Sequence, residues 1–176
     1  MTNLVGSGFT RVGGDACSPG GSEPKFAAIT LKTPREGRDY MKLPQAGGCQ
    51  CGKVRYEITE APQLVYACHC RDCQRLTSSA FSMGIVVTES GFHLAGIEPK
   101  SLQRLADSGR TSTRWVCPEC GSWIAGPPRD GLVRVRAGTL DDTSWLRPTR
   151  HIWTRSKQPW VTFAEGDEIF EAQPPA

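Results

Sequence analysis

The sequence has no apolar run that approaches the roughly 20 residues needed to span a membrane, and its N-terminus lacks the apolar core of a secretory signal. We therefore expect a cytoplasmic protein with no membrane partner. The chain also lacks a phosphate-binding glycine loop and a serine-nucleophile motif. Long basic runs and coiled-coil heptads are missing as well, which argues against a nucleic-acid partner.

The length of 176 residues fits one domain, and the 19 glycines and 13 prolines favour turns and strands over long helices. The formal charge is +3 with neutral thiols. If seven cysteines bound two zinc ions as thiolates, the total charge would fall close to zero. The basic balance is therefore no evidence for an acidic or nucleic-acid ligand.

Seven of the eight cysteines fall into three groups of two, three and two. The outer pairs belong to the turns CQCG and CPECG, and they are Cys49, Cys51, Cys117 and Cys120. In a reducing compartment such pairs indicate metal ligands rather than disulfides, and no thioredoxin-like βαβ context supports a redox motif. We predict that the two pairs together close one structural zinc site with four sulfurs.

The middle group, Cys68, Cys70 and Cys73, supplies only three sulfurs, which is typical of a zinc site with an open fourth position. In an extended segment the side chain of His69 points away from the neighbouring sulfurs, so we expect a packed histidine rather than a fourth ligand. Three thiolates make zinc a weaker Lewis acid than three histidines would. A substrate thiolate is therefore a more plausible fourth ligand than activated water.

Five sequence words and a closing segment carry a family resemblance. They are GGCQCGKVRYE at 47–57, ACHCRDCQRLTSSAF at 67–81, WVCPECGSWIA at 115–125, RVRAGTLDD at 134–142, RHIW at 150–153 and the segment 157–160. With these words the chain resembles the glutathione-dependent formaldehyde-activating enzymes and their centromere-associated relatives. The resemblance implies a zinc-containing, Mss4-like tent fold, a carbon–sulfur lyase activity, and glutathione and formaldehyde as substrates.

The chain divides at about residue 45. Residues 1–44 are rich in Gly, Ser, Pro and Thr and predict a flexible extension, in which Cys17 is a free thiol. Met41 is a plausible natural start of translation. Residues 45–170 form the expected zinc-binding domain, which is mainly β with small antiparallel sheets pinned by zinc.

Alternation of apolar and polar residues predicts most of the strands. The expected strands cover 54–58, 64–67, 81–88, 101–106, 112–116, 122–125, 132–137, 150–154 and 160–163, and a short helix covers 71–79. On the strand at 132–137 we expect Arg134 and Arg136 to face outward. After residue 163 the acidic, proline-ended chain is expected to fray.

The remaining polar residues leave alternatives open. His151 either lines the pocket as an acid or base or is a structural histidine. Asp141 and Asp142 are an acid–base pair or, more simply, a turn cap. Basic side chains that either offset the thiolate charge or are solvated are Lys53, Arg71 and Arg75.

The favoured function is a zinc-dependent carbon–sulfur lyase that holds a small thiol on the second zinc and joins it to an aldehyde, or splits the adduct. The alternative is a non-catalytic zinc module that binds a protein or nucleic acid. A third possibility is a lyase for an unrelated small molecule. An accessible metal in a concave pocket favours an enzyme, whereas a fully ligated second metal beside an exposed patch favours the module.

Overall fold

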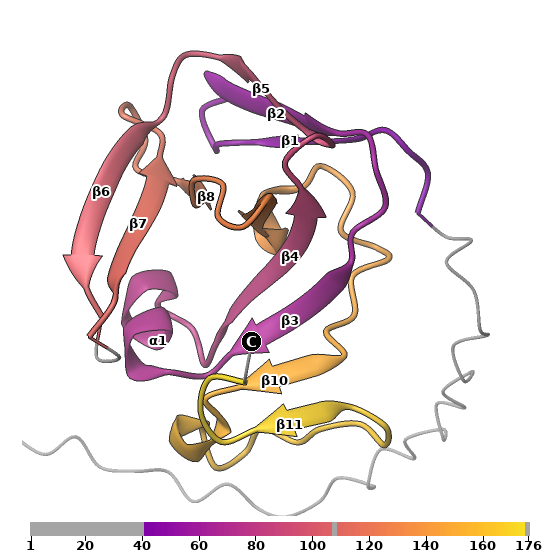
Figure 1. Cartoon of the computed structure of the whole chain (residues 1–176), viewed down its shortest axis with the longest axis vertical. Coiled ribbons are helices and arrows are strands. Elements are labelled where there is room, and N and C mark those ends of the chain that lie inside the picture. Colours follow the sequence, from indigo (N-terminus) through magenta and orange to yellow (C-terminus); the bar gives the residue numbers. More distant parts are fainter. Residues whose placement is uncertain (1–40, 107–108, 175–176) are drawn as a thin grey trace, which may run out of the picture. The chain divides into compact units, whose positions relative to one another are not determined.

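The computed structural model describes residues 41–106 and 109–174 (Figure 1). Most of the predicted extension, including Cys17, lies outside the described residues, so its dispensability and the proposed start at Met41 stay predictions. The described part is mainly β with a single α-helix, as the sequence indicates. No helix in this part of the chain combines the length and apolar character needed to cross a membrane.

The smaller sheet has three antiparallel strands in the order β1-β2-β5: β1 (Gln45–Gly48), β2 (Val54–Ile58) and β5 (Phe92–Gly96). In β2 the apolar residues Val54, Tyr56 and Ile58 are buried while Glu57 is exposed, which confirms the predicted alternation. The first strand was not predicted because its sequence, QAGG, has no apolar alternation.

The larger sheet has eight strands in the order β11-β10-β3-β4-β9-β8-β7-β6. The strands are β3 (Leu64–Cys68), β4 (Ser82–Thr88), β6 (Lys100–Leu105), β7 (Thr111–Val116), β8 (Trp123–Ala125), β9 (Leu132–Arg136), β10 (Arg150–Ile152) and β11 (Glu168–Phe170). Its pairs are antiparallel, except that β10 is parallel to both β3 and β11. The helix α1 (Arg71–Thr77) follows β3, and the 3₁₀ turns η2 (Ala137–Thr139) and η3 (Thr154–Ser156) follow β9 and β10.

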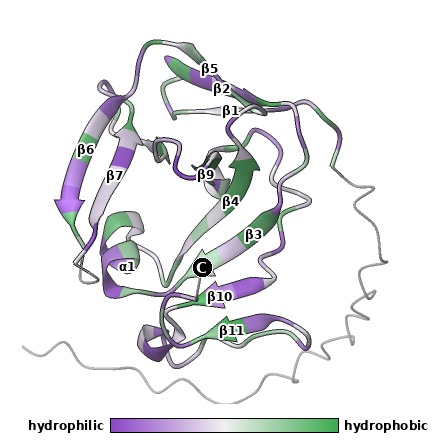
Figure 2. Ribbon diagram, in the orientation of Figure 1, coloured by the Kyte–Doolittle hydropathy of each residue, from purple (hydrophilic) through white to green (hydrophobic). Residues whose placement is uncertain are grey.

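The hydrophobic core joins the two sheets. The apolar face of β2 packs in one cluster with residues of β4, β8 and β9, among them Ile85, Ile124 and Val135, all fully buried. The hydropathy-coloured ribbon shows β4 as an apolar strand near the middle of the large sheet (Figure 2). Each such aliphatic side chain contributes about 1.5–3 kcal/mol by leaving water.

The C-terminal part differs from the prediction in two ways. Residues 160–163 form no strand: Pro159 and Trp160 lie in a turn, residues 161–163 have no regular structure, and Trp160 is 70% exposed. The chain also does not fray after 163 within the described residues, because β11 pairs in parallel with β10. A local pattern cannot reveal this pairing, since its hydrogen bonds depend on a strand that is distant in the sequence.

Candidate metal centres and the pocket beside them

Two turns bring the outer cysteine pairs together. Cys49 and Cys51 lie between β1 and β2, and Cys117 and Cys120 lie between β7 and β8. Their four sulfurs lie within 4.8 Å of one another, with Cys49 Sγ 3.4 Å from Cys51 Sγ and Cys51 Sγ 3.7 Å from Cys117 Sγ. A tetrahedral zinc with bonds of about 2.3 Å separates its sulfurs by about 3.8 Å. The group is therefore suited to hold a metal ion.

Each turn is closed by the glycine that follows its second cysteine. The amide of Gly52 donates to the Cys49 carbonyl, and that of Gly121 to the Cys117 carbonyl, each at 3.0 Å. Both glycines have φ of +75°, a conformation that side chains other than glycine rarely adopt. The Val54 amide also donates to Cys49 Sγ at 3.2 Å, as amides do to metal-bound thiolates.

The middle cysteines form a second group at the junction of β3 and α1. Cys68 ends β3, Cys70 is the N-cap of α1 and accepts the Cys73 amide, and the three sulfurs lie within 4.8 Å of one another. No further His, Cys, Asp or Glu of residues 41–106 and 109–174 joins the group. Hydrogen bonding from the Cys68 and Cys70 thiols is the largest cause that lowers the pKa of Cys73, and the charge of Arg136 acts in the same direction.

His69 points away from the three sulfurs, as predicted for a packed histidine. Its side chain is fully buried among Phe81 and Phe163, and its Nε2 lies 3.0 Å from His151 Nδ1. Burial lowers the pKa of His69 to about 4, so the ring is neutral at pH 7. His151 in turn contacts Asp167 with its Nε2 at 3.3 Å. His151 thus lies in a buried row of polar contacts that runs from His69 through His151 to Asp167.

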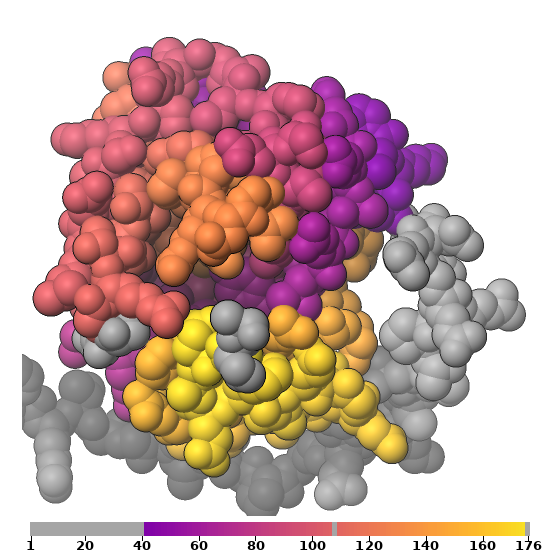
Figure 3. Space-filling view, viewed as in Figure 1, coloured from indigo at the N-terminus to yellow at the C-terminus, as the bar shows by residue number. Residues whose placement is uncertain are grey.

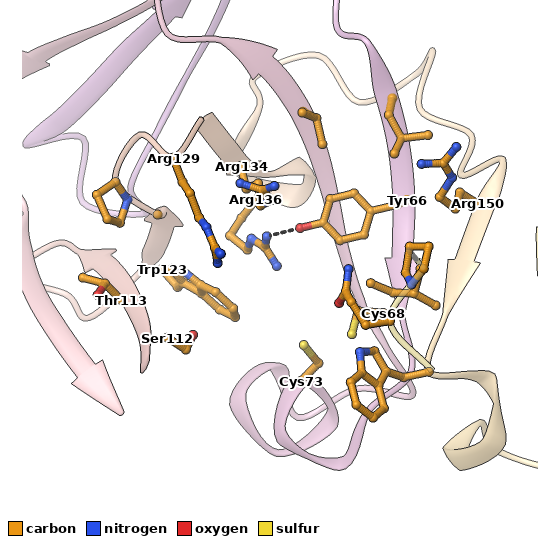
Figure 4. Close-up of a pocket in the computed structure, with 18 of the residues that line it drawn as sticks. Tyr66, Cys68, Cys73, Ser112, Thr113, Trp123, Arg129, Arg134, Arg136 and Arg150 are labelled. Atoms are coloured by element: carbon orange, nitrogen blue, oxygen red, sulfur yellow. Dashed lines mark hydrogen bonds between the residues drawn. The ribbon is translucent and has the colours of Figure 1, made fainter. Parts of the chain in front are cut away.

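A cavity of about 520 Å³ opens beside the three cysteines, and the sulfur-bearing residues Cys68 and Cys73 line it (Figure 4). An adjoining cavity of about 740 Å³ is lined by Cys70 and shares residues such as Arg134 and Trp153 with the first. In the space-filling view, the orange segment between β8 and β9 and the yellow C-terminal residues are both visible on the face shown (Figure 3), and both segments contribute to the pocket wall. His151 is not among the lining residues of either cavity.

Four arginines line the first cavity, and no Asp or Glu of the described residues does; they are Arg129, Arg134, Arg136 and Arg150. Arg136 is only 9% exposed. Its Nη2 donates to the Tyr66 hydroxyl at 2.6 Å, its Nη1 donates to Ser82 at 3.3 Å, and its guanidinium lies 4.2 Å from the Trp123 ring centroid. The prediction that Arg136 faces outward is wrong: it shares a face of β9 with Arg134, but that face borders the pocket.

Comparisons with known proteins identify the family of this chain. The family model described as glutathione-dependent formaldehyde-activating enzyme matches residues 44–156, which is more than half of the chain. The chain belongs to this family. A Sordaria macrospora protein, whose name provisionally assigns it to the same enzymes, is 29% identical over 109 residues. That match covers 58% of this chain and 44% of the relative, so the chain spans less than half of the relative's length.

A crystal structure of a Rhodobacter sphaeroides protein is also similar, with 18% identity and a TM-score of 0.43. The likeness covers 58% of this chain and 91% of that one.

Asp141 and Asp142, the acidic residues of the segment 134–142, line neither cavity and have partners elsewhere. Asp142 accepts the Ser144 amide at 2.9 Å, as a turn cap does, and Asp141 forms an exposed ion pair with Arg55. Among the predicted basic residues, Lys53 binds Glu119 at 2.7 Å and Arg71 donates to Gln74 at 3.2 Å. Arg71 also lines the second cavity, whereas the cations in the wall of the first cavity are the arginines of β9, the preceding loop and β10.

Proposed function

We propose that this member of the formaldehyde-activating family is a zinc-dependent carbon–sulfur lyase that joins a small thiol to an aldehyde or splits the adduct. The observation that carries the proposal is that two residues of a three-cysteine group line a pocket rich in arginine. A zinc module without catalysis would instead need a fully ligated second metal. His69, which lies between two of these cysteines in the sequence, is hydrogen-bonded to His151 instead.

The donor sets fit zinc in both places. Thiolates are soft ligands that favour zinc over calcium or magnesium, and the sulfur groups have the required proximity. Cys49, Cys51, Cys117 and Cys120 would hold a structural ion, and Cys68, Cys70 and Cys73 would hold a second one. Bound there, the second ion supplies a coordination position at which a substrate thiol ionises. Seven cysteines kept as thiolates require a reducing compartment, which supports a cytoplasmic location.

The pocket's charge supports an anionic thiol. Arg134 and Arg136 have no carboxylate partner among residues 41–106 and 109–174, and no acidic side chain of this part of the chain lines the first cavity. Carboxylates bind guanidinium groups through charge-assisted hydrogen bonds. Glutathione, which carries two carboxylates, fits this requirement, and the name of the Sordaria relative points to the same thiol.

The reaction follows from placing a thiolate next to a carbonyl. The sulfur forms a bond to the carbonyl carbon, the π-electron pair moves to oxygen, and that oxygen takes up a proton; the lyase direction reverses each change. The pocket would contribute proximity by holding both reactants in one cavity, whose wall includes the aromatic rings of Tyr66, Trp123 and Trp153.

Exchange spectroscopy with ¹³C-formaldehyde and glutathione tests this activity. Zinc-loaded protein should raise the exchange rate between free formaldehyde and its S-hydroxymethyl adduct above the uncatalysed rate. Cys70→Ser should abolish the increase, while circular dichroism shows an intact fold because the four-cysteine site remains. A rate equal to that of buffer would refute the lyase.

A further inference from the structure

We infer that Tyr66 and Arg136 form the binding site for the aldehyde oxygen and stabilise the negative charge that develops on it. This inference rests on the proposed function. It adds two catalytic residues that touch the reacting oxygen, whereas the cysteines act on the thiol.

The sheet register builds the pair directly beside the cysteines. Tyr66 on β3 and Arg136 on β9 are each opposite the same residue of the intervening strand, Gly84 on β4. A Cβ on Gly84 would lie 2.7 Å from the Tyr66 ring and hydroxyl, which is too close for a real contact. Because residue 84 is glycine, the Tyr66 ring has room to extend across β4 toward Arg136. Tyr66 also precedes Cys68 by two residues on one strand, so both side chains lie on the same face of β3, with their Cα atoms about 6.7 Å apart.

A third residue links the pair to the sulfurs. Ser82 is opposite Cys68 in the β3–β4 ladder and accepts a hydrogen bond from Arg136 Nη1 at 3.3 Å. Figure 4 shows the Tyr66 hydroxyl, the Arg136 guanidinium and the sulfurs of Cys68 and Cys73 directed into the same pocket. If a substrate thiolate is held beside these cysteines, an aldehyde that it attacks would lie between the thiolate and Tyr66 and Arg136. The hydrogen-bond donors of these two residues would then face the aldehyde oxygen.

The hydrogen-bond pattern leaves donors free for a ligand. The Tyr66 oxygen accepts from Arg136 Nη2 at 2.6 Å, so its own proton is not used in that bond. No acceptor within the described residues is bonded to this proton, although the hydroxyl belongs to a pocket-lining residue. A guanidinium has five N–H donors, and the two bonds to Tyr66 and Ser82 leave three of them. The N–H of Nε is buried without a partner, so the two remaining Nη donors are the ones left for a ligand.

Charge balance supports the same role. Arg136 is buried, and no carboxylate of the described residues neutralises it. An unpaired buried cation is costly, but three thiolates around one divalent zinc would carry one net negative charge and would offset it. The Trp123 ring, 4.2 Å away, holds the guanidinium in place. The cation is thus fixed beside the cysteines before an oxyanion forms, as electrostatic preorganisation requires.

Addition of the thiol to the aldehyde conserves protons and electrons, and neither Tyr66 nor Arg136 changes its protonation state. A thiol held beside Cys68, Cys70 and Cys73 would first lose its proton to solvent, with the charge of a bound zinc favouring the thiolate. As the sulfur–carbon bond forms, the carbonyl π pair moves to oxygen, where Tyr66 O–H and Arg136 N–H donate hydrogen bonds and keep their protons. Water then protonates the oxygen, which returns the proton that the thiol released.

Tyr66→Phe tests the inference, with Tyr56→Phe as the matched control. Tyr56 lies in β2, where its hydroxyl contacts Thr139 Oγ1 at 2.8 Å, and it lines neither cavity. Exchange spectroscopy gives the rate of formaldehyde addition, calorimetry gives the glutathione Kd, and metal analysis gives the zinc content. Loss of one oxyanion donor reduces a rate by about 100- to 1000-fold. We expect such a loss for Tyr66→Phe, with unchanged Kd and zinc content, and a wild-type rate for Tyr56→Phe.

Each outcome has a distinct meaning. An unchanged rate in Tyr66→Phe, or an equal loss in Tyr56→Phe, overturns the role of Tyr66. A weakened glutathione Kd that accounts for the whole loss overturns it too, because the tyrosine would then bind the thiol. If the wild-type protein binds glutathione but does not accelerate addition, the proposed lyase fails and this inference fails with it. Arg136→Lys, which keeps the charge but loses the planar donor array, should slow addition with zinc retained.

Discussion

The backbone amide of Gln50 donates to the Ser122 hydroxyl at 3.1 Å and thereby links two cysteine turns that are 72 residues apart. The same hydroxyl lies 3.2 Å from Cys120 Sγ. One turn belongs to the three-stranded sheet and the other to the eight-stranded sheet. The four-cysteine group therefore ties the sheets together at the edge of their shared core.

Cys120→Ala should remove the zinc at the four-cysteine site and leave the domain largely unfolded or insoluble. One lost ligand opens a closed site, and structural zinc contributes about 10–16 kcal/mol to folding in small peptides. Metal analysis and thermal melting check this. Ser122→Ala is the control, since it removes the hydroxyl but no ligand, and it should lower Tm by only a few degrees. A soluble Cys120→Ala protein with wild-type Tm and zinc content would refute the structural role.

Gly84→Ala should slow formaldehyde addition and destabilise the fold by about 1–3 kcal/mol, because the new methyl group overlaps the Tyr66 ring. Gly138→Ala is the matched control: nothing lies within 4 Å of its added Cβ, and its φ is not in the left-handed region. Urea unfolding and the exchange rate are the measurements. Equal effects of the two substitutions would contradict the packing of Tyr66 against Gly84.

Arg134→Gln should weaken glutathione binding several-fold and reduce its dependence on salt, because a cation in the wall of both cavities is lost. Arg75→Gln is the control, since Arg75 is exposed on α1 and lines neither cavity. Calorimetric titrations at two salt concentrations compare the variants. An equal loss of glutathione affinity in the two variants would mean that the net charge of the protein, and not a cation in the pocket wall, determines binding.

A chain that starts at Met41 should fold and bind as much zinc as the full chain. The composition of residues 1–40 offers few apolar groups to bury. Thermal melting of both chains, with metal analysis, checks this expectation. A loss of several degrees in Tm after truncation would show that the N-terminal residues pack on the domain.

The sequence predicted the features that depend only on residues close to one another along the chain. Pairs of cysteines in tight turns indicated which sulfurs meet, and the extended segment around His69 indicated that its ring points away from them. Period-two alternation located most strands, including β2 and β9. These signals are local, so a single strand or turn is enough to reveal them.

What the sequence could not supply depends on contacts between distant segments. Alternation correctly placed Arg134 and Arg136 on one face of β9, yet only the neighbouring strands and the C-terminal residues turn that face into a pocket wall. The Tyr66–Arg136 contact spans 70 residues and needs a glycine on the strand between them. Likewise, the sequence alone leaves His151 as either a pocket acid or base or a structural histidine, and only the pairing of β10 with β3 brings it beside His69.

The central claim is that the three-cysteine group holds a metal with a position open to a substrate thiol. Calorimetric titration of the zinc-loaded protein with glutathione and with S-methylglutathione tests it most directly. We predict that glutathione binds, that the S-methyl form binds far more weakly, and that Cys70→Ser loses the difference while keeping its fold. Equal binding of the two peptides to the wild-type protein would contradict the claim, because the thiol would then not reach the metal.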